Sequence, residues 1–268
     1  MVLITATIGY VLGGGGVKSW LELLLMLVGT GLSASGSAVL NNYLERDTDS
    51  RMYRTRGRAL PSGEVDAAHA LSFGVLLTLS GVCLLVWKTN LLTGFIVLLT
   101  AFLYVLVYTP LKRVTWLNTT FGAIPGALPP VSGWAAATGD VELGSMVLFL
   151  ILFAWQHPHF YAIAWMHRED YARAGFKMLP VVEPDGCRMF RHSVLYSVLL
   201  MMVSLLPVYM GMTGPIYLVG ALVVGSMFLF SGIVAARSKS LADARKMLQA
   251  SVIYLPVLLT LIVLDFNF

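Results

Sequence analysis

Charged residues are scarce in this chain of 268 residues, because aspartate, glutamate, lysine and arginine together make up 12% of it and hydrophobic residues make up 57%. The mean hydropathy of +0.79 is far from that of an ordinary soluble domain. These values exclude a soluble globular protein and indicate an integral membrane protein. Cysteine is rarer still, and the two that are present, Cys83 and Cys187, fit neither a metal-binding spacing nor a disulfide framework.

Apolar runs that are long enough to cross a hydrocarbon core of about 30 Å recur along the chain. They lie near residues 20–44, 67–87, 90–108, 117–137, 144–166, 193–213, 216–236 and 248–265. With a shorter run at 2–12, they predict nine transmembrane helices and an all-α, polytopic fold in a single membrane domain, residues 1–268. Because roughly eleven residues at about 1.5 Å each reach only half-way across a bilayer, we expect the first helix to be truncated.

Lysine and arginine are distributed unevenly between the connections. Sixteen of the eighteen follow the second, fourth, sixth and eighth runs, and only Lys18 and Lys88 lie on the other side. The positive-inside rule therefore predicts that the charged connections are cytoplasmic, in a bacterial or a mitochondrial inner membrane. The formal net charge of +4 reflects this topology and does not indicate a nucleic-acid partner.

The second apolar run ends in a polar stretch, residues 41–58. Asn41, Glu45 and Asp49 recur at every fourth position and therefore share one face of a helix. Small residues upstream on that face would let another helix approach closely, so we expect the face to look into a bundle. Clustered carboxylates in an interior need a cation, and hard oxygen ligands suit Mg²⁺, which commonly bridges to substrate phosphates.

Basic residues provide the complementary half of a diphosphate site. The planar guanidinium groups of Arg54 and Arg58 can hold phosphate oxygens. Lys112 and Arg113 follow the fourth run, on the same side of the membrane, where they could neutralise a leaving diphosphate. The pattern predicts a site for a metal and a diphosphate. The alternative is a solvated loop whose charges only orient the protein.

A second polar segment lies at the end of the sixth run, residues 155–171. Pro158 lacks a backbone donor, so we expect it to kink the helix and to redirect His157 and His159. A neutral imidazole at membrane depth can ligate iron, hold a metal or accept a proton. We expect this segment to face the acidic one across a cavity. The alternative is that both histidines are hydrogen-bonded residues of the core.

Four blocks of the chain together resemble a known family. They are residues 41–63, 108–113, 126–134 and 155–160. In this order they resemble the UbiA-type intramembrane prenyltransferases, and within them the branch that farnesylates protohaem IX. The resemblance covers nearly the whole chain. It implies a nine-helix UbiA-like bundle around a central cavity, and transfer of a farnesyl group from farnesyl diphosphate to a vinyl group of haem b. Water adds in the same reaction, which gives haem O.

The resemblance also implies roles for individual residues and a Mg²⁺ cofactor. The implied catalytic residues are Asn41, Glu45, Asp49, Lys112 and Arg113. The implied substrate-binding residues are Arg54, Arg58, Tyr108, Asn118, His157, His159 and Tyr161. The implied metal ligands are Asn41, Glu45 and Asp49, with Asp47, Glu169 and Asp170 as further candidates. Glu45 departs from the pattern, because the family motif has an aspartate at that position.

A second departure concerns the acceptor. Quinone-type members carry a second aspartate-rich motif near the position of Tyr161, and this chain has His157 and His159 before that position instead. This difference favours a porphyrin acceptor. The implied partners are farnesyl diphosphate, haem b and membrane lipid, with haem A synthase or terminal oxidase assembly downstream. Two alternatives remain, a prenyltransferase with an aromatic acceptor and a non-enzymatic transporter or haem carrier, although a carrier would not need arginines beside a metal site.

Overall fold

The computed structural model describes residues 1–267, which form a bundle of α-helices. The helices are α1 Val2–Gly14, α2 Trp20–Asp49, α3 Ala67–Lys88, α4 Leu91–Phe102, η1 Leu103–Tyr108, α5 Thr109–Val114, α6 Asn118–Ala127, α7 Pro129–Thr138, α8 Leu143–Met166, α9 Arg168–Arg173, α10 Leu179–Val182, α11 Cys187–Val203, α12 Leu206–Tyr209, α13 Pro215–Ser238 and α14 Leu241–Leu264. The element η1 is a π-helical turn that continues α4 into α5.

Seven helical segments of the described chain are long and apolar enough to cross a membrane, and α1 is a shorter apolar helix. They are α2, α3, the continuous segment Leu91–Val114, α8, the segment Cys187–Tyr209, α13 and α14. The apolar run predicted near 117–137 forms two helices, α6 and α7, because Pro129 and Pro130 start a new helix after Leu128. Every predicted run is therefore helical, and the chain is a polytopic, all-α integral membrane protein.

Several helices extend further into the charged segments than the apolar runs predict. The second helix continues to Asp49, α11 begins at Cys187, and α14 begins at Leu241. As a result, Arg188, Arg191, Arg245 and Lys246 lie within helices and not in connections. A hydropathy pattern stops where charge begins, whereas a helix can continue into the membrane interface, where long basic side chains reach water.

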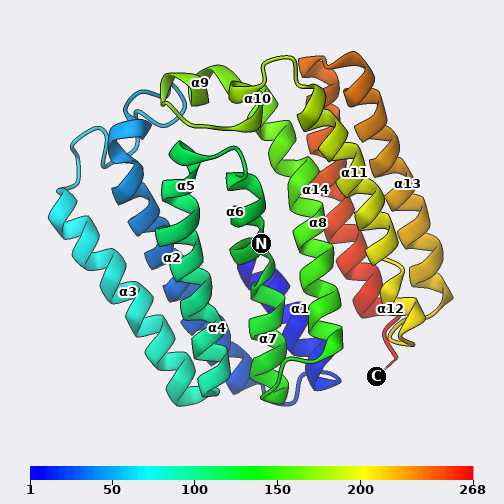
Figure 1. Ribbon diagram of the computed structural model, residues 1–268. Helices are drawn as coiled ribbons and strands as arrows, with labels where there is room; N and C mark the ends of the chain where they lie inside the picture. The colour runs from blue at the N-terminus through cyan, green and yellow to red at the C-terminus, as the bar shows by residue number, and fades with distance from the viewer. Residues whose placement is uncertain (268) are drawn as a thin grey trace.

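The bundle places the two long outer helices α3 and α13 at opposite edges, with α6 between α5 and α8 and α7 between α4 and α8 (Figure 1). One buried apolar cluster joins α8 to α11, α13 and α14, and another joins α1 to α2, α3 and α4. Helices α9 and α10 lie at the end of the bundle where α2 and α5 meet the long loop that precedes α3 (Figure 1). The charged segments thus gather at one end of the molecule.

Glycine allows two pairs of helices to pack at backbone distance. On α2, a Cβ atom at Gly36 would lie 2.6 Å from the carbonyl oxygen of Gly74 on α3. Between α1 and α7, a Cβ atom at Gly9 would overlap the carbonyl oxygen of Pro130, and one at Gly133 would overlap that of Ala6. Small residues at such interfaces are the usual means by which membrane helices approach closely. These contacts fix α2 and α7 in position.

Hydrogen bonds connect the charged segments at one end of the bundle. The backbone amide of Tyr53 donates to Asp170 Oδ1 at 3.2 Å, which joins the loop after α2 to α9. The backbone amide of Lys177 donates to the carbonyl oxygen of Lys112 at 2.7 Å. The side chain of Asn118 donates to the carbonyl oxygen of Lys177 at 3.1 Å. These bonds hold residues from three separate connections over the ends of α2 and α5.

Candidate active site

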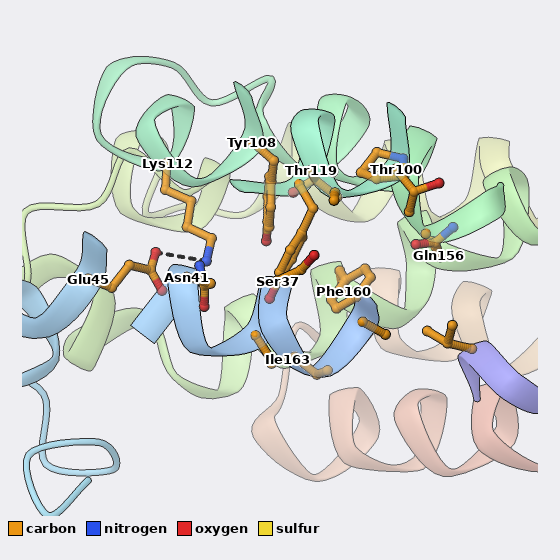
Figure 2. Close-up of a pocket in the computed structure, with 18 of the residues that line it drawn as sticks. Ser37, Asn41, Glu45, Thr100, Tyr108, Lys112, Thr119, Gln156, Phe160 and Ile163 are labelled. Atoms are coloured by element: carbon orange, nitrogen blue, oxygen red, sulfur yellow. Dashed lines mark ion pairs between the residues drawn. The ribbon is translucent and has the colours of Figure 1, made fainter. Parts of the chain in front are cut away.

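A cavity of about 560 Å³ opens inside the bundle, between α2, the segment from α4 to α6, and α8. This volume falls within the range of roughly 300–1,000 Å³ that is usual for small-molecule sites. Its lining includes the side chains of Ser37, Asn41, Glu45, Asp49, Arg54, Arg58, Thr100, Tyr104, Tyr108, Lys112, Thr119, Gln156, Phe160, Ile163, Tyr171 and Phe176. Glu45 and Lys112 lie at one end of the view, and Thr100 and Gln156 lie at the other (Figure 2).

Two ion pairs form the polar end of this cavity. Lys112 Nζ lies 2.8 Å from Glu45 Oε1, and Arg58 Nη1 lies 2.8 Å from Asp49 Oδ2. Glu45 and Asp49 are buried on adjacent turns of α2, as their four-residue spacing predicts. Arg58 comes from the loop after α2 and Lys112 from α5, so the cations reach the carboxylates from two different segments.

The carboxylates retain unused capacity to bind a cation. Asp49 Oδ1 is buried without a hydrogen-bond partner in the described part of the chain. Glu45 Oε1 contacts the Lys112 ammonium group but accepts no hydrogen bond. Buried polar oxygens are normally paired, so the unpartnered Asp49 Oδ1 indicates that a ligand belongs there. Carboxylate oxygens are ligands that Mg²⁺ prefers.

The described residues contain no group of three histidine, cysteine, aspartate or glutamate side chains that could hold a metal ion. The protein therefore offers two carboxylates, together with Asn41, which lies one turn before Glu45 and also lines the cavity. Mg²⁺ commonly takes only one or two carboxylates and completes its coordination with water and substrate phosphates. The residues present fit a Mg²⁺ ion that binds together with a phosphorylated substrate.

Two further predicted residues also line the cavity beside these pairs. Arg54 donates to the hydroxyl group of Tyr171 at 3.5 Å, which holds its guanidinium group over the polar end. The ring of Tyr108 lies under the Lys112 ammonium group, with 4.6 Å from Nζ to the ring centroid. Tyr104 stacks on Tyr108, with 5.9 Å between the centroids. Aromatic faces therefore adjoin the cationic end of the cavity.

Two predicted residues of the α5 and α6 region do not line the cavity. Arg113 donates to the hydroxyl group of Thr48 on α2 at 3.2 Å. Asn118 is fully buried, and its amide group donates to the carbonyl oxygens of Thr115 and Lys177. Both side chains join segments of the protein to one another. Lys112 and Arg113 diverge because one helical residue turns a side chain by about 100°.

The further candidates for metal ligands also lie away from the cavity. The side chain of Asp47 is 73% exposed, since it is two residues from Glu45 and faces the opposite side of α2. Glu169 is exposed on α9. Asp170 pairs with Arg173 and accepts from the backbone of Tyr53. The expectation that these three acids are ligands disagrees with this arrangement.

The histidine segment also differs from its prediction. The helix continues through Pro158, and Gln156, Phe160 and Ile163 of α8 face the cavity. His157 and His159 are turned to either side of that face by about 100°. The segment therefore faces the acidic one across the cavity, as predicted, but through Gln156, Phe160 and Ile163, and neither histidine lines the cavity.

Each histidine has its own surroundings. The His157 ring stacks on Tyr196, with 3.6 Å between centroids, and lies 3.2 Å from the hydroxyl group of Thr120. His159 Nδ1 lies 2.8 Å from the hydroxyl group of Ser251 on α14. Tyr161 is buried beside the His157 ring and does not line the cavity. The side of α8 that bears His157 packs on α6 and α11, and the side that bears His159 packs on α14.

Sequence reasoning did not identify several residues of the cavity wall. Tyr104, Tyr171 and Phe176 surround Tyr108 and Lys112, and Ser37 and Thr119 contribute hydroxyl groups further along. Tyr104 precedes Tyr108 by four residues and Lys112 follows Tyr108 by four, so the spacing on one helix face contained a signal for Tyr104. Phe176 lies in a connection whose course no local pattern predicts.

Comparisons with known proteins agree with this geometry. A protein named "Protoheme IX farnesyltransferase" from Solibacter usitatus (strain Ellin6076) is 49% identical over 274 aligned residues, which cover 99% of this chain and 94% of that protein. A solved structure concerned with digeranylgeranylglyceryl phosphate synthase superposes with a TM-score of 0.84 at 18% identity, over 98% of this chain and 92% of the other. A UbiA homologue from Archaeoglobus fulgidus, solved bound to GPP and Mg²⁺, superposes with a TM-score of 0.66 at 16% identity, over 98% and 96% of the two chains.

The structural likeness at such low identity establishes a shared fold, and the sequence comparison establishes the family. The model of the UbiA prenyltransferase family matches residues 2–255, which is nearly the whole chain. The cavity with its paired acids and cations therefore belongs to a polytopic helical bundle of known lineage, and this chain is a member of the UbiA prenyltransferase family.

Proposed function

We propose that this chain transfers a farnesyl group from farnesyl diphosphate to a vinyl group of haem b, with addition of water, to give haem O. The observation that carries this proposal is a single cavity with paired acids and cations at one end and a mainly apolar wall, with scattered hydroxyl and amide groups, along the rest. Such a cavity suits a molecule with a charged head and a long apolar chain. The relative named "Protoheme IX farnesyltransferase", aligned over almost the full chain, supports the choice of substrates.

The polar end would hold the diphosphate and its metal. Asn41, Glu45 and Asp49 would bind Mg²⁺, which neutralises charge on the diphosphate and so assists its departure. Magnesium together with a prenyl diphosphate in the Archaeoglobus fulgidus homologue supports this cofactor. Lys112, Arg54 and Arg58 would bind the phosphate oxygens and stabilise the negative charge that develops on the leaving group. Electrostatic interactions at this end are stronger than in water, because apolar side chains nearby lower the local dielectric constant.

The rest of the cavity would shield the allylic cation that remains. Tyr104 and Tyr108 present aromatic faces beside the diphosphate end, and the Lys112 ammonium group over Tyr108 shows that this face accommodates a cation. Apolar side chains from α4, α6 and α8 exclude bulk water, which would otherwise capture the cation before the vinyl group reaches it.

The acceptor would enter beside Phe160, a cavity-lining residue that is 39% exposed. Of the two predicted haem-binding histidines, His157 is fixed by Phe153, Thr120 and Tyr196. The His159 ring contacts Ser251 on α14 and its neighbours Trp155 and Phe160 on α8. We assign His159 to the porphyrin, which requires its ring to leave Ser251. We assign His157 to the packing of α8 on α6 and α11.

We propose further that the charged end of the bundle is cytoplasmic, in a bacterial inner membrane, as the distribution of lysine and arginine supports. Residues 1–268 would act as one domain, because helices from α2 to α8 contribute to one cavity. The product would pass to haem A synthase or to the assembly of a terminal oxidase.

Pigment extraction tests this function. Membranes from a host that lacks its own enzyme would express this chain with a supply of farnesyl diphosphate, and the haems would be extracted and separated. We expect haem O in membranes with the wild-type chain and none in membranes with an Asp49→Asn variant. A prenylated phenol in place of haem O would assign an aromatic acceptor, and haem b alone in both samples would overturn the prenyltransferase assignment.

A further inference from the structure

The amide group of Asn41 is held by a residue outside its own helix. Asn41 is buried on α2, with an exposed fraction of 6%, and its Nδ2 donates to Thr109 Oγ1 at 2.9 Å. Thr109 is the first residue of α5, and it lies 68 positions away in the sequence. Asn41 lines the cavity, and within residues 1–267 no hydrogen bond to its Oδ1 is found, so this oxygen is available to a ligand there.

The direction of the Asn41–Thr109 hydrogen bond follows from the second bond of Thr109. The hydroxyl group of Thr109 has one proton, which it donates to the carbonyl oxygen of Tyr104 at 2.8 Å. Its oxygen can therefore only accept from Asn41, and the amide must offer its NH₂ group. A flipped amide would require the hydroxyl group to turn away from Tyr104, and the Thr109–Tyr104 bond would be lost. The threonine thereby fixes which end of the Asn41 amide group is the oxygen and which is NH₂, although the two ends have nearly the same shape.

The π-helical turn Leu103–Tyr108 makes this arrangement possible. In a π-turn the bond spans five residues, and the backbone amide of Thr109 bonds to the carbonyl oxygen of Tyr104. The Thr109 side chain adds a second bond to that same carbonyl oxygen. Such turns are rare and are frequent at functional sites. Here the turn brings a hydroxyl group of α5 against α2, one helical turn before Glu45.

We propose that Thr109 is a positioning residue that orients the Asn41 carbonyl oxygen toward the cation of the diphosphate site. Asn41 Oδ1 would then join Glu45 and Asp49 on the same face of α2, and three oxygens would converge on one ion. An amide in the opposite orientation would present NH₂ to Mg²⁺ and repel it. This inference rests on the proposed function for the identity of the ion and extends it to a residue that does not touch the ion.

A set of matched variants tests the inference. Thr109→Val keeps the shape of the side chain and removes the hydroxyl group, whereas Thr109→Ser keeps the hydroxyl group. Thr78→Val on α3 is the control, because the Thr78 hydroxyl group is buried and bonds to the carbonyl oxygen of Gly74, away from the cavity. The measurements are the binding of a non-hydrolysable farnesyl diphosphate analogue to purified protein by calorimetry over a range of Mg²⁺ concentrations, and the thermal midpoint Tm.

We expect Thr109→Val to raise the half-saturating Mg²⁺ concentration by about five- to tenfold, the effect of one lost hydrogen bond. Thr109→Ser and Thr78→Val should bind as the wild type does. In an Asn41→Ala background, Thr109→Val should cause no further change in Mg²⁺ dependence, because the two residues act through one amide. A purely structural role for Thr109 would lower Tm in both backgrounds and leave the Mg²⁺ dependence unchanged.

The outcomes separate this inference from the proposed function. If wild-type membranes make haem O and Thr109→Val binds the analogue with unchanged Mg²⁺ dependence, the inference is overturned and the function stands. If the wild type makes no haem O, but its analogue binding shows the expected Mg²⁺ dependence in the variants, the inference stands without the acceptor assignment. Equal effects of Thr109→Val in the wild-type and Asn41→Ala backgrounds would also overturn it.

Discussion

Lys112 and Glu45 form an ion pair at 2.8 Å, and their side chains are only 12% and 6% exposed. The pair joins α5 to α2 across the end of the cavity. A buried pair of this kind recovers little net free energy of folding, because both charges leave water to form it. Removal of one partner is costly, since the other charge remains buried alone.

This asymmetry predicts different results for single and double substitutions. Lys112→Met should destabilise the protein by about 1–3 kcal/mol, because the Glu45 carboxylate loses its partner. A double variant, Glu45→Gln with Lys112→Met, should regain most of the decrease in Tm that Lys112→Met causes, in a thermal scan of the detergent-purified protein. Both variants should lose haem O formation. A double variant that is as unstable as Lys112→Met alone would contradict this account of the pair.

Substitution of Asp49 should abolish most turnover. Asp49→Asn keeps the shape of the side chain but removes the negative charge that pairs with Arg58 and that would balance the charge of Mg²⁺. We expect haem O production to fall by roughly 100-fold or more. Asp47→Asn is the matched control, because Asp47 is on the same helix and faces solvent. Equal losses in the two variants would remove Asp49 from the site.

Asp170 should hold the loop that carries Arg54 and Arg58 against α9. Burial raises the pKa of the Asp170 carboxyl group, but hydrogen bonds from Arg173 and from the Tyr53 amide outweigh burial and hold the pKa below its usual value. A lowered folded pKa means that this stabilisation is present above the unfolded pKa of about 3.9 and is lost as the pH falls through the folded value.

Limited proteolysis measures how firmly Asp170 holds this loop. In Asp170→Asn the loop should open more often, so trypsin should cleave it faster at neutral pH, after Arg54, Arg56 or Arg58. Glu169→Gln, at the exposed neighbouring position, should be cleaved at the wild-type rate. Unchanged cleavage in Asp170→Asn would show that other contacts hold the loop.

The two histidines should have separable effects. His159→Ala should weaken the Soret band of haem bound to the purified protein and reduce haem O, while a farnesyl diphosphate analogue still binds in Mg²⁺. His157→Ala should chiefly lower Tm, because its ring fills the space beside Tyr196 and Thr120. Arg54→Ala with Arg58→Ala should show the reverse of His159→Ala, with haem bound and the analogue lost. A normal Soret band and normal haem O formation in His159→Ala would refute its assignment to the porphyrin.

Labelling from outside the cell tests the orientation. Cysteine would be introduced by Gly57→Cys at the charged end or by Asp140→Cys at the other, in a chain with Cys83 and Cys187 replaced by serine. A Cβ atom added at Gly57 would meet open space, and Asp140 is exposed in a turn. A membrane-impermeant thiol reagent should label only Asp140→Cys in intact cells. Labelling of both from outside would contradict the proposed topology.

The sequence predicted those features that depend on local periodicity. Twenty apolar residues in a row can satisfy their backbone only as a helix in lipid, so the membrane helices were predictable from hydropathy. The four-residue spacing of Asn41, Glu45 and Asp49 placed them on one wall of the cavity, although their roles remain predictions. The same periodicity places Asp47 about half a turn away from Glu45, where its side chain is exposed, so the prediction of Asp47 as a further ligand went against this pattern.

The features that the sequence did not predict depend on tertiary contacts. The rotation of α8 about its axis decides that Gln156 faces the cavity and His157 does not, and that rotation is set by packing on α6, α11 and α14. The π-turn before Thr109 shifts the phase of the helix by a fraction of a turn, which no hydrophobic pattern reveals. Ion pairs such as Arg58–Asp49 join residues whose loop geometry is not encoded locally.

The glycine contact between α2 and α3 has a consequence for which substitutions the protein can tolerate. No residue of α3 lines the cavity in the described chain, and α3 forms an outer edge of the bundle. Yet a methyl group on Gly36 would meet the Gly74 backbone and displace the helix that carries Glu45 and Asp49. A single added carbon atom at this distant interface would therefore act as an active-site mutation. Distance from the reacting atoms is a poor guide to mutational tolerance in this protein, because the close approach of two helices at Gly36 and Gly74 sets the position of the acids.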